Sequence, residues 1–179
     1  MARKPLTIDQ PRYAKWVEAS NGLTKIAPGL PVFIQGLGKI DAQLAWEDAA
    51  FLALPAQDRA SLEESIKLTD RITLSRLWLL GAYEVIRTLS QRVKANPRAL
   101  PKRLGERVHR VKREFARVRM PLAKLEPAKS HAKTDFADAV PAMNRQLGIS
   151  WKVAKRVIVP RHKMSERLLK LLLSASAHK

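Results

Sequence analysis

The sequence contains no cysteine, few aromatic residues (6%) and no long uncharged hydrophobic run. Without thiolates, it has no disulfide bonds, no thiol catalysis and no cysteine-ligated zinc or iron–sulfur centre. No stretch approaches the roughly 18 apolar residues needed to cross a bilayer, and no signal-peptide segment follows Met1. We therefore expect a soluble protein of a reducing, cytoplasmic compartment, without a metal or other cofactor.

Acidic residues are also scarce, with 16 Asp and Glu against 34 Lys and Arg, for a formal net charge of +18. The imbalance begins near Arg92, because residues 91–134 carry 14 Lys and Arg but only 3 Asp and Glu. A positive surface attracts polyanions, since bound phosphates release their counterions. The charge therefore predicts a nucleic acid partner, RNA or DNA, or alternatively an acidic protein. Oligomer formation is a further possibility that the sequence leaves open.

Length and composition predict a single, mainly α domain over residues 1–179, with ordinary contents of hydrophobic (46%) and charged (28%) residues. Four prolines and four glycines in residues 1–40 predict an irregular, wrapping N-terminal segment. Within it we expect only a short helix over 12–18 and a short strand over 31–34.

Residues 41–120 are predicted to form a helical core. An alanine-rich helix should begin after Asp41 as its N-cap and end before Pro55. A capping box at Ser61 and Glu64 should begin a second helix that reaches Asn96. Because an unbroken helix of this length is long for a small domain, we expect an interruption over 69–73. Its second half has helical apolar spacing and should be the central core helix, through Trp78, Ala82, Val85, Leu89 and Val93.

A basic helix is predicted over 102–119, ending or kinking at Pro121. Its apolar residues follow spacings of three and four and should pack against the preceding helix in antiparallel fashion: Leu104, Val108, Val111, Phe115 and Val118. Residues 121–148 read as loop-rich. Residues 149–179 are predicted to form a short β-hairpin that turns near residues 154–156, and then a leucine-rich C-terminal helix, capped by Ser165, that docks on the core.

The basic helix supplies the candidate binding residues Arg103, Arg107, Arg110, Arg113 and Arg117. Arginine binds phosphate with a fixed two-pronged geometry, and residues at these spacings share much of one helical surface. No zinc finger, RNA-recognition motif or helix-turn-helix accompanies them, so the sequence predicts binding to nucleic-acid backbone without strong sequence specificity. The alternative is a solvated face whose arginines pair with the acids Glu63, Glu64 and Asp70.

Two other functions stay open at this point. The first is a protein-interaction or inhibitor module that docks its basic surface on an acidic partner. The second is a metal-independent ribonuclease of the HEPN type, because Arg103 and His109 match the spacing of its Arg and His. In that case His109 would be the acid or base, and Arg103 would stabilise phosphate charge. The chain's four histidines and 18 arginines produce about one such match by chance, so we expect a binding protein rather than an enzyme.

One acid, Glu84, lies within an apolar stretch of the second helix. An unpaired carboxylate there would be costly to bury. We therefore expect Glu84 to form a structural ion pair with Arg76 or Arg87 on the same helix, or with an arginine of the basic helix.

Overall fold

The computed structural model describes residues 7–177 and confirms a mainly helical fold with an antiparallel sheet near the C-terminus. Residues 1–6 of the predicted irregular segment lie outside this range. The elements are α1 (Gln10–Asn21), α2 (Pro31–Ala53), α3 (Ala56–Arg59), α4 (Leu62–Ala95), α5 (Lys102–Lys124), the 3-10 helix η1 (Lys129–His131), β1 (Asp135–Asn144), β2 (Gly148–Ala154), β3 (Val157–Pro160) and α6 (Arg161–Ser176).

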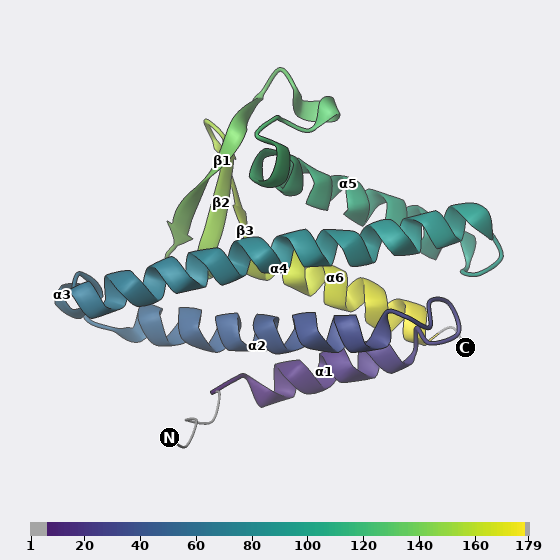
Figure 1. Cartoon of the computed structure of the whole chain (residues 1–179), viewed down its shortest axis with the longest axis horizontal. Coiled ribbons are helices and arrows are strands. Elements are labelled where there is room, and N and C mark those ends of the chain that lie inside the picture. The colour runs from purple at the N-terminus through teal and green to yellow at the C-terminus, as the bar shows by residue number, and fades with distance from the viewer. Residues whose placement is uncertain (1–6, 178–179) are drawn as a thin grey trace.

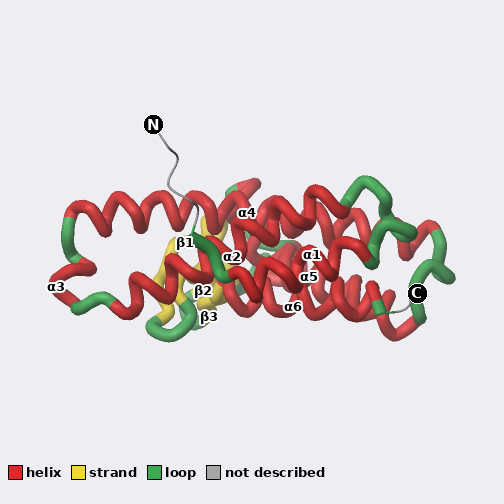
Figure 2. The backbone as a smooth tube through the Cα atoms, turned by 90° about the horizontal axis from the view of Figure 1, so that it is seen from below, coloured by secondary structure: helices red, strands yellow, loops and turns green. Residues whose placement is uncertain are grey.

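The helices run roughly along the long axis of the molecule, and the strands are confined to one part of it (Figure 2). The long helix α4 packs against α2 and α5, and α6 contacts α1, α4 and α5 (Figure 1). The sheet has the order β1-β2-β3, with both pairs antiparallel. Its central strand β2 contacts α2, α5 and α6, so the sheet closes one side of the helical core. No helix within residues 7–177 is long and apolar enough to span a membrane.

The N-terminal region is more helical than its prolines suggest. Asp9 caps α1 by accepting a hydrogen bond from the backbone N–H of Arg12 at 3.0 Å, and Pro11 occupies the first turn. The strand predicted over 31–34 is wrong, because Pro31 begins α2, where a missing N–H costs nothing. Irregular backbone occupies residues 22–30, between α1 and α2.

Asp41 is not an N-cap, as the sequence suggested, but a completely buried residue in the middle of α2. It accepts hydrogen bonds from the indole of Trp16 at 2.9 Å and from the guanidinium of Arg12 at 2.5 Å. An acid in this position was misread as a helix start because its partners lie far away in the sequence.

The expected interruption of the second helix is also wrong, since α4 continues through residues 69–73. The hydroxyls of Thr69 and Thr73 donate to the carbonyl oxygens four residues earlier, which satisfies both side chains within the helix. The predicted cap at Ser61 is confirmed, with its Oγ accepting from the N–H of Glu64 at 3.2 Å, and α4 ends at Ala95 as expected.

Residues 121–148 are less loop-rich than predicted. Helix α5 continues through Pro121 to Lys124, and β1 occupies much of the rest. Pro141 disfavoured a strand prediction, but β1 is an edge strand, where a residue without an N–H is tolerated. The predicted hairpin is confirmed as β2 and β3, with Trp151 opposite Val159.

The core is built around three aromatic side chains from separate helices. The rings of Trp16 and Trp78 meet edge to face at 6.3 Å between centroids, and Trp78 lies at the same distance from Phe115. The predicted core positions of α4 and the apolar residues of α5 are all buried, so the packing of these two helices is as expected. Helix α6 docks on the core through its leucines, as predicted, although Ser165 is buried within the helix instead of capping it.

Candidate nucleic-acid interface

The basic face of α5 follows from the way this helix is buried. Its five apolar residues from Leu104 to Val118 face the core, so the arginines between them are directed to the remaining surface. Arg103, Arg110 and Arg113 are exposed, and Arg107 is half-buried. The structure therefore leaves these four of the five predicted arginines without an ion pair in residues 7–177 and at least partly in contact with solvent.

The fifth, Arg117, is already occupied by an internal partner. Its Nε and Nη2 donate to the two carboxylate oxygens of Asp135 on β1, at 2.7 and 2.9 Å. Burial raises the pKa of Asp135, but the hydrogen bonds from Arg117 and Thr134 and the nearby positive charge of Arg117 together outweigh it, so the net pKa is lowered. This pair fastens α5 to the sheet, so Arg117 is less available to a phosphate than its neighbours.

A groove of about 460 Å³ runs between α5 and α6 and collects the positive charge of both helices. Arg107 and Arg110 contribute from α5, and Arg167 and Lys170 contribute from α6. Each pair is spaced three residues apart, so both members lie on the same side of their helix. Arg167 and Lys170 were missed by sequence analysis, because only the contact between α5 and α6 brings them beside the basic helix.

Two carboxylates also line this groove, and both already have a cationic partner. Glu114 accepts from Arg167 at 2.9 Å, across the groove between α5 and α6. Glu166 accepts from Arg12 of α1 at 2.5 Å. Arg110 and Lys170 form no ion pair within residues 7–177, and Arg107 donates only to the hydroxyl of Ser174 at 3.2 Å. The groove therefore retains a surplus of positive charge.

The acids of the first half of the chain do not neutralise this face. Glu63 and Glu64 both pair with Lys67 on their own helix, at 2.7 and 2.8 Å. Glu84 pairs with Arg87 at 2.6 Å, which confirms the predicted ion pair, although both side chains are exposed rather than buried. Within residues 7–177, no arginine of α5 forms an ion pair with Glu63, Glu64 or Asp70, so this predicted pairing is wrong.

A larger hollow, about 680 Å³, lies between α2 and α4. Its walls include Trp46, Phe51, Leu54 and Leu74, and its acids outnumber its bases: Glu47, Glu64 and Asp70 against Lys67 and Arg71. Size and apolar lining alone would make it a candidate binding site. Its charge does not suit a polyanion, so the groove between α5 and α6 is the better candidate for one.

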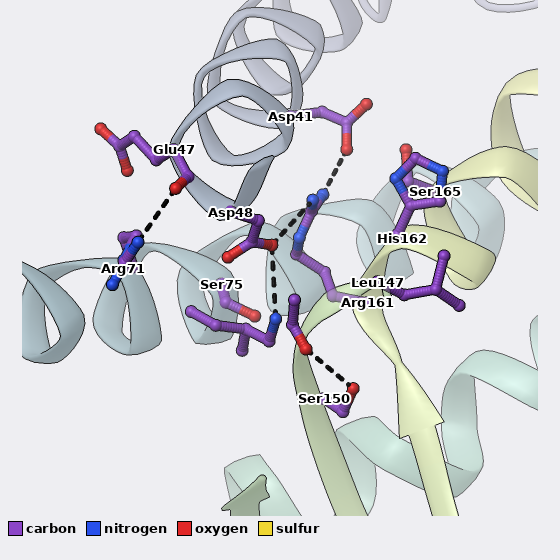
Figure 3. Close-up of polar contacts among 12 residues, drawn as sticks. Asp41, Glu47, Asp48, Arg71, Ser75, Leu147, Ser150, Arg161, His162 and Ser165 are labelled. Carbon is purple, nitrogen blue, oxygen red and sulfur yellow. Dashed lines mark hydrogen bonds and ion pairs between the residues drawn. The ribbon is translucent and has the colours of Figure 1, made fainter. Parts of the chain in front are cut away.

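A buried network of charges holds α6 in place beside the groove (Figure 3). Arg161, the first residue of α6, is completely buried and forms an ion pair with Asp41. Its Nη2 also lies 3.7 Å from the carboxylate of Asp48. Arg12 extends the network from Asp41 to Glu166, so the acids of α2 position the helix that forms one wall of the groove.

Burial and neighbouring charges shift the pKa values of this network in different directions. Burial alone would raise the pKa of Asp41, but Arg161 and Arg12 outweigh it and hold this pKa below its usual value. For Asp48, burial dominates over the attraction of Arg161, and the pKa is raised. Burial, together with Arg12 and Arg161, lowers the pKa of His162. Asp41 is therefore the carboxylate that the two arginines keep ionised.

The proposed ribonuclease pair is not brought together by α5. Six helical positions separate Arg103 from His109, which turns their side chains about 120° apart around the axis. His109 is directed toward α4, with its Nδ1 2.9 Å from the hydroxyl of Ser90, whereas Arg103 is exposed. Within residues 7–177, no cluster of three His, Asp or Glu side chains is arranged to hold a metal ion.

Comparison with known proteins adds no relative from which a function can be transferred. No protein-family model, no curated protein and no solved structure matches the chain.

Proposed function

We propose that this protein binds the phosphate backbone of nucleic acid in the groove between α5 and α6. The observation that carries the proposal is the convergence of Arg107, Arg110, Arg167 and Lys170 from two helices on one groove. Because α5 and α6 pack on each other, the backbones that carry these cations are already in place, which reduces the entropic cost of binding. The exposed side chains of Arg103 and Arg113 extend the positive surface along α5.

The way α5 is buried supports backbone binding without strong sequence specificity. A recognition helix reads bases by entering the major groove, which requires a broad exposed side of the helix with side chains that reach base edges. Helix α5 packs on α4 along one side and on α6 along another. It therefore presents only a narrow, charged surface, suited to phosphates rather than base edges. We propose that this binding takes place in the cytoplasm.

Salt dependence of binding tests the proposal. We expect the affinity of the full chain for labelled nucleic acid, measured by fluorescence anisotropy, to fall steeply between about 50 and about 200 mM salt. The double variant Arg107→Glu/Arg110→Glu should weaken binding and reduce the slope of log K against log salt by about two. The matched control Arg59→Glu/Arg145→Glu makes the same charge change at exposed positions outside the groove and should have a much smaller effect.

Affinity that is indifferent to salt, or equal losses in the two double variants, would contradict a phosphate site in this groove. Purification of the chain from cells separates the alternative partner classes. A nucleic acid ligand predicts co-purifying material that nuclease removes, whereas an acidic protein predicts a stoichiometric second chain that survives nuclease treatment.

A further inference from the structure

We propose that the groove between α5 and α6 selects double-stranded over single-stranded nucleic acid. This inference rests on the proposed function and names the form of nucleic acid that the same site takes. It follows from the chemistry of the groove walls, which provide charge for a backbone and no surface on which bases can stack.

All seven residues that line the groove are charged or aliphatic: Arg107, Arg110, Val111, Glu114, Glu166, Arg167 and Lys170. Proteins that hold single strands combine a basic groove with aromatic rings, and each stacked base adds about 1–3 kcal/mol. The large aromatic side chains with the greatest exposure in residues 7–177 belong to other elements, Phe33 and Trp46 on α2 and Phe136 on β1. A single strand in this groove would leave its bases unstacked.

The guanidinium groups of the groove are poor substitutes for aromatic rings. Arginine planes stack on bases in some complexes. Here Arg167 is held by the carboxylate of Glu114 and Arg107 by the hydroxyl of Ser174. Two of the three groove arginines are therefore engaged in internal contacts that a stacking base would have to break.

A duplex meets the requirements of this surface better than a single strand. From Arg103 to Arg113 the basic side of α5 extends about 15 Å, over which a duplex presents about nine phosphate charges. A single strand of the same length presents fewer. A duplex is also stiff at this scale, so it loses little conformational freedom when it lies along two fixed helices. Charge density and rigidity therefore both favour the duplex.

Separate titrations with matched duplex and single-stranded ligands test the selectivity. The full chain is titrated with a labelled duplex DNA, a duplex RNA of the same sequence, and an oligothymidine of equal length that cannot pair with itself. We expect both duplexes to bind at least about tenfold more tightly than the oligothymidine at the same salt concentration. Equal or tighter binding of oligothymidine would overturn the selectivity for duplexes.

A paired substitution at Glu114 tests the stacking argument directly. Glu114→Trp places a ring at the groove wall, and Glu114→Gln removes the same charge without adding one. We expect Glu114→Trp to bind oligothymidine more tightly than Glu114→Gln does, with little difference between the two variants for duplex. An unchanged ratio of duplex to single-strand affinity between the two variants would overturn stacking as the reason for the selectivity.

These results are distinguishable from failure of the proposed function itself. If single strands bind as well as duplexes, and Arg107→Glu/Arg110→Glu still weakens binding and reduces its salt dependence, the groove is a phosphate site without duplex preference. If neither form binds at low salt, both the proposed function and this inference are wrong.

Discussion

Glu114 limits how much positive charge the groove between α5 and α6 offers to a ligand. Its carboxylate accepts from Arg167 at 2.9 Å and is partly exposed. An incoming phosphate must therefore compete with this side chain for the Arg167 guanidinium. Exposed ion pairs of this kind are weak, so the competition is one that a polyanion wins at a modest cost.

Glu114→Gln should therefore raise the affinity for duplex nucleic acid about two- to fivefold, because it frees Arg167 and removes one repelling charge. Anisotropy titrations at low salt provide the measurement. Glu84→Gln is the matched control, since it breaks the exposed ion pair with Arg87 on α4, outside the groove. Equal gains in both variants would show that net charge alone, and not the state of Arg167, sets the affinity.

Asp41 is the residue on which the buried network depends. Asp41→Asn leaves Arg12 and Arg161 without their shared carboxylate, and removal of one partner from a buried pair typically costs about 3–5 kcal/mol. We expect a loss of this size in the free energy of unfolding, measured by urea denaturation at neutral pH. Asp58→Asn, at an exposed position on α3, is the control and should change little.

The same residue predicts a pH dependence. Because the folded pKa of Asp41 lies below its unfolded value, its contribution is complete above about pH 4 and is lost as the pH falls through the folded pKa. The gap in stability between the wild-type chain and Asp41→Asn should therefore narrow in acid. A gap that stays constant as the pH is lowered through this range would mean that Asp41 acts through shape rather than charge.

At the scale of the elements, the close approach of α1 and α2 depends on a single glycine. A Cβ added at Gly38 would lie 2.3 Å from the Cβ of Trp16, a distance that packed side chains cannot adopt. Gly36, two positions earlier on α2, is exposed and has open space around the same added atom. Packing therefore requires a glycine at position 38 but not at position 36.

Alanine substitutions at these positions should have opposite effects. Gly38→Ala should destabilise the fold by about 1–3 kcal/mol, because α1 must move away from α2. Gly36→Ala should stabilise it by about 0.5–1 kcal/mol, because glycine inside a helix costs conformational entropy. Thermal or urea unfolding of the two variants checks both signs. A stabilising Gly38→Ala would mean that α1 and α2 are not in this close contact.

The elements that could be predicted from the sequence are those with local signals. Each of these signals lies within a single helix. They are the apolar periodicity of Trp78 to Val93, the apolar periodicity of Leu104 to Val118, and the cap at Ser61. The beginning of α2 was missed because Gly38 was read as a sign of irregular backbone. Its actual reason is the close contact with Trp16 on α1, which no pattern within α2 indicates. Strand β1 was missed because its pairing with β2 is irregular between Asp135 and Val140 and contains Pro141.

Only the α5 side of the candidate site could be predicted from the sequence. Arg107 and Arg110 follow from the apolar pattern of α5, which fixes the face they occupy. Arg167 and Lys170 lie more than fifty residues further along, and nothing local indicates that α6 lies beside α5. The network that sets this position joins Asp41 to Arg161 across 120 residues, a distance at which no sequence pattern is informative.

At the scale of the whole molecule, a net charge of +18 acts against compactness as well as for binding. Like charges repel within the folded chain, and salt screens this repulsion. In the absence of nucleic acid we therefore expect the melting temperature to rise by about 2–4 °C between low and moderate salt, over the range in which affinity for a polyanion falls. Thermal unfolding at a series of salt concentrations provides the measurement.

The double variant Arg107→Glu/Arg110→Glu serves as the comparison for this effect. It removes four of the 18 net charges, and should therefore show a smaller rise in melting temperature with salt. A melting temperature that falls with salt in both proteins would show that attractive ion pairs, rather than repulsion, dominate the surface electrostatics.

The ion pair between Asp41 and Arg161 also bears on how the chain is made. A ribosome releases residues in order, so α1 and α2 emerge long before α6. Until Arg161 arrives, Asp41 and Asp48 have no cation from α6, and burying both carboxylates without it is unfavourable. The first helices should therefore stay solvated during translation, and a nascent chain stalled before Pro160 should remain sensitive to protease in α1 and α2.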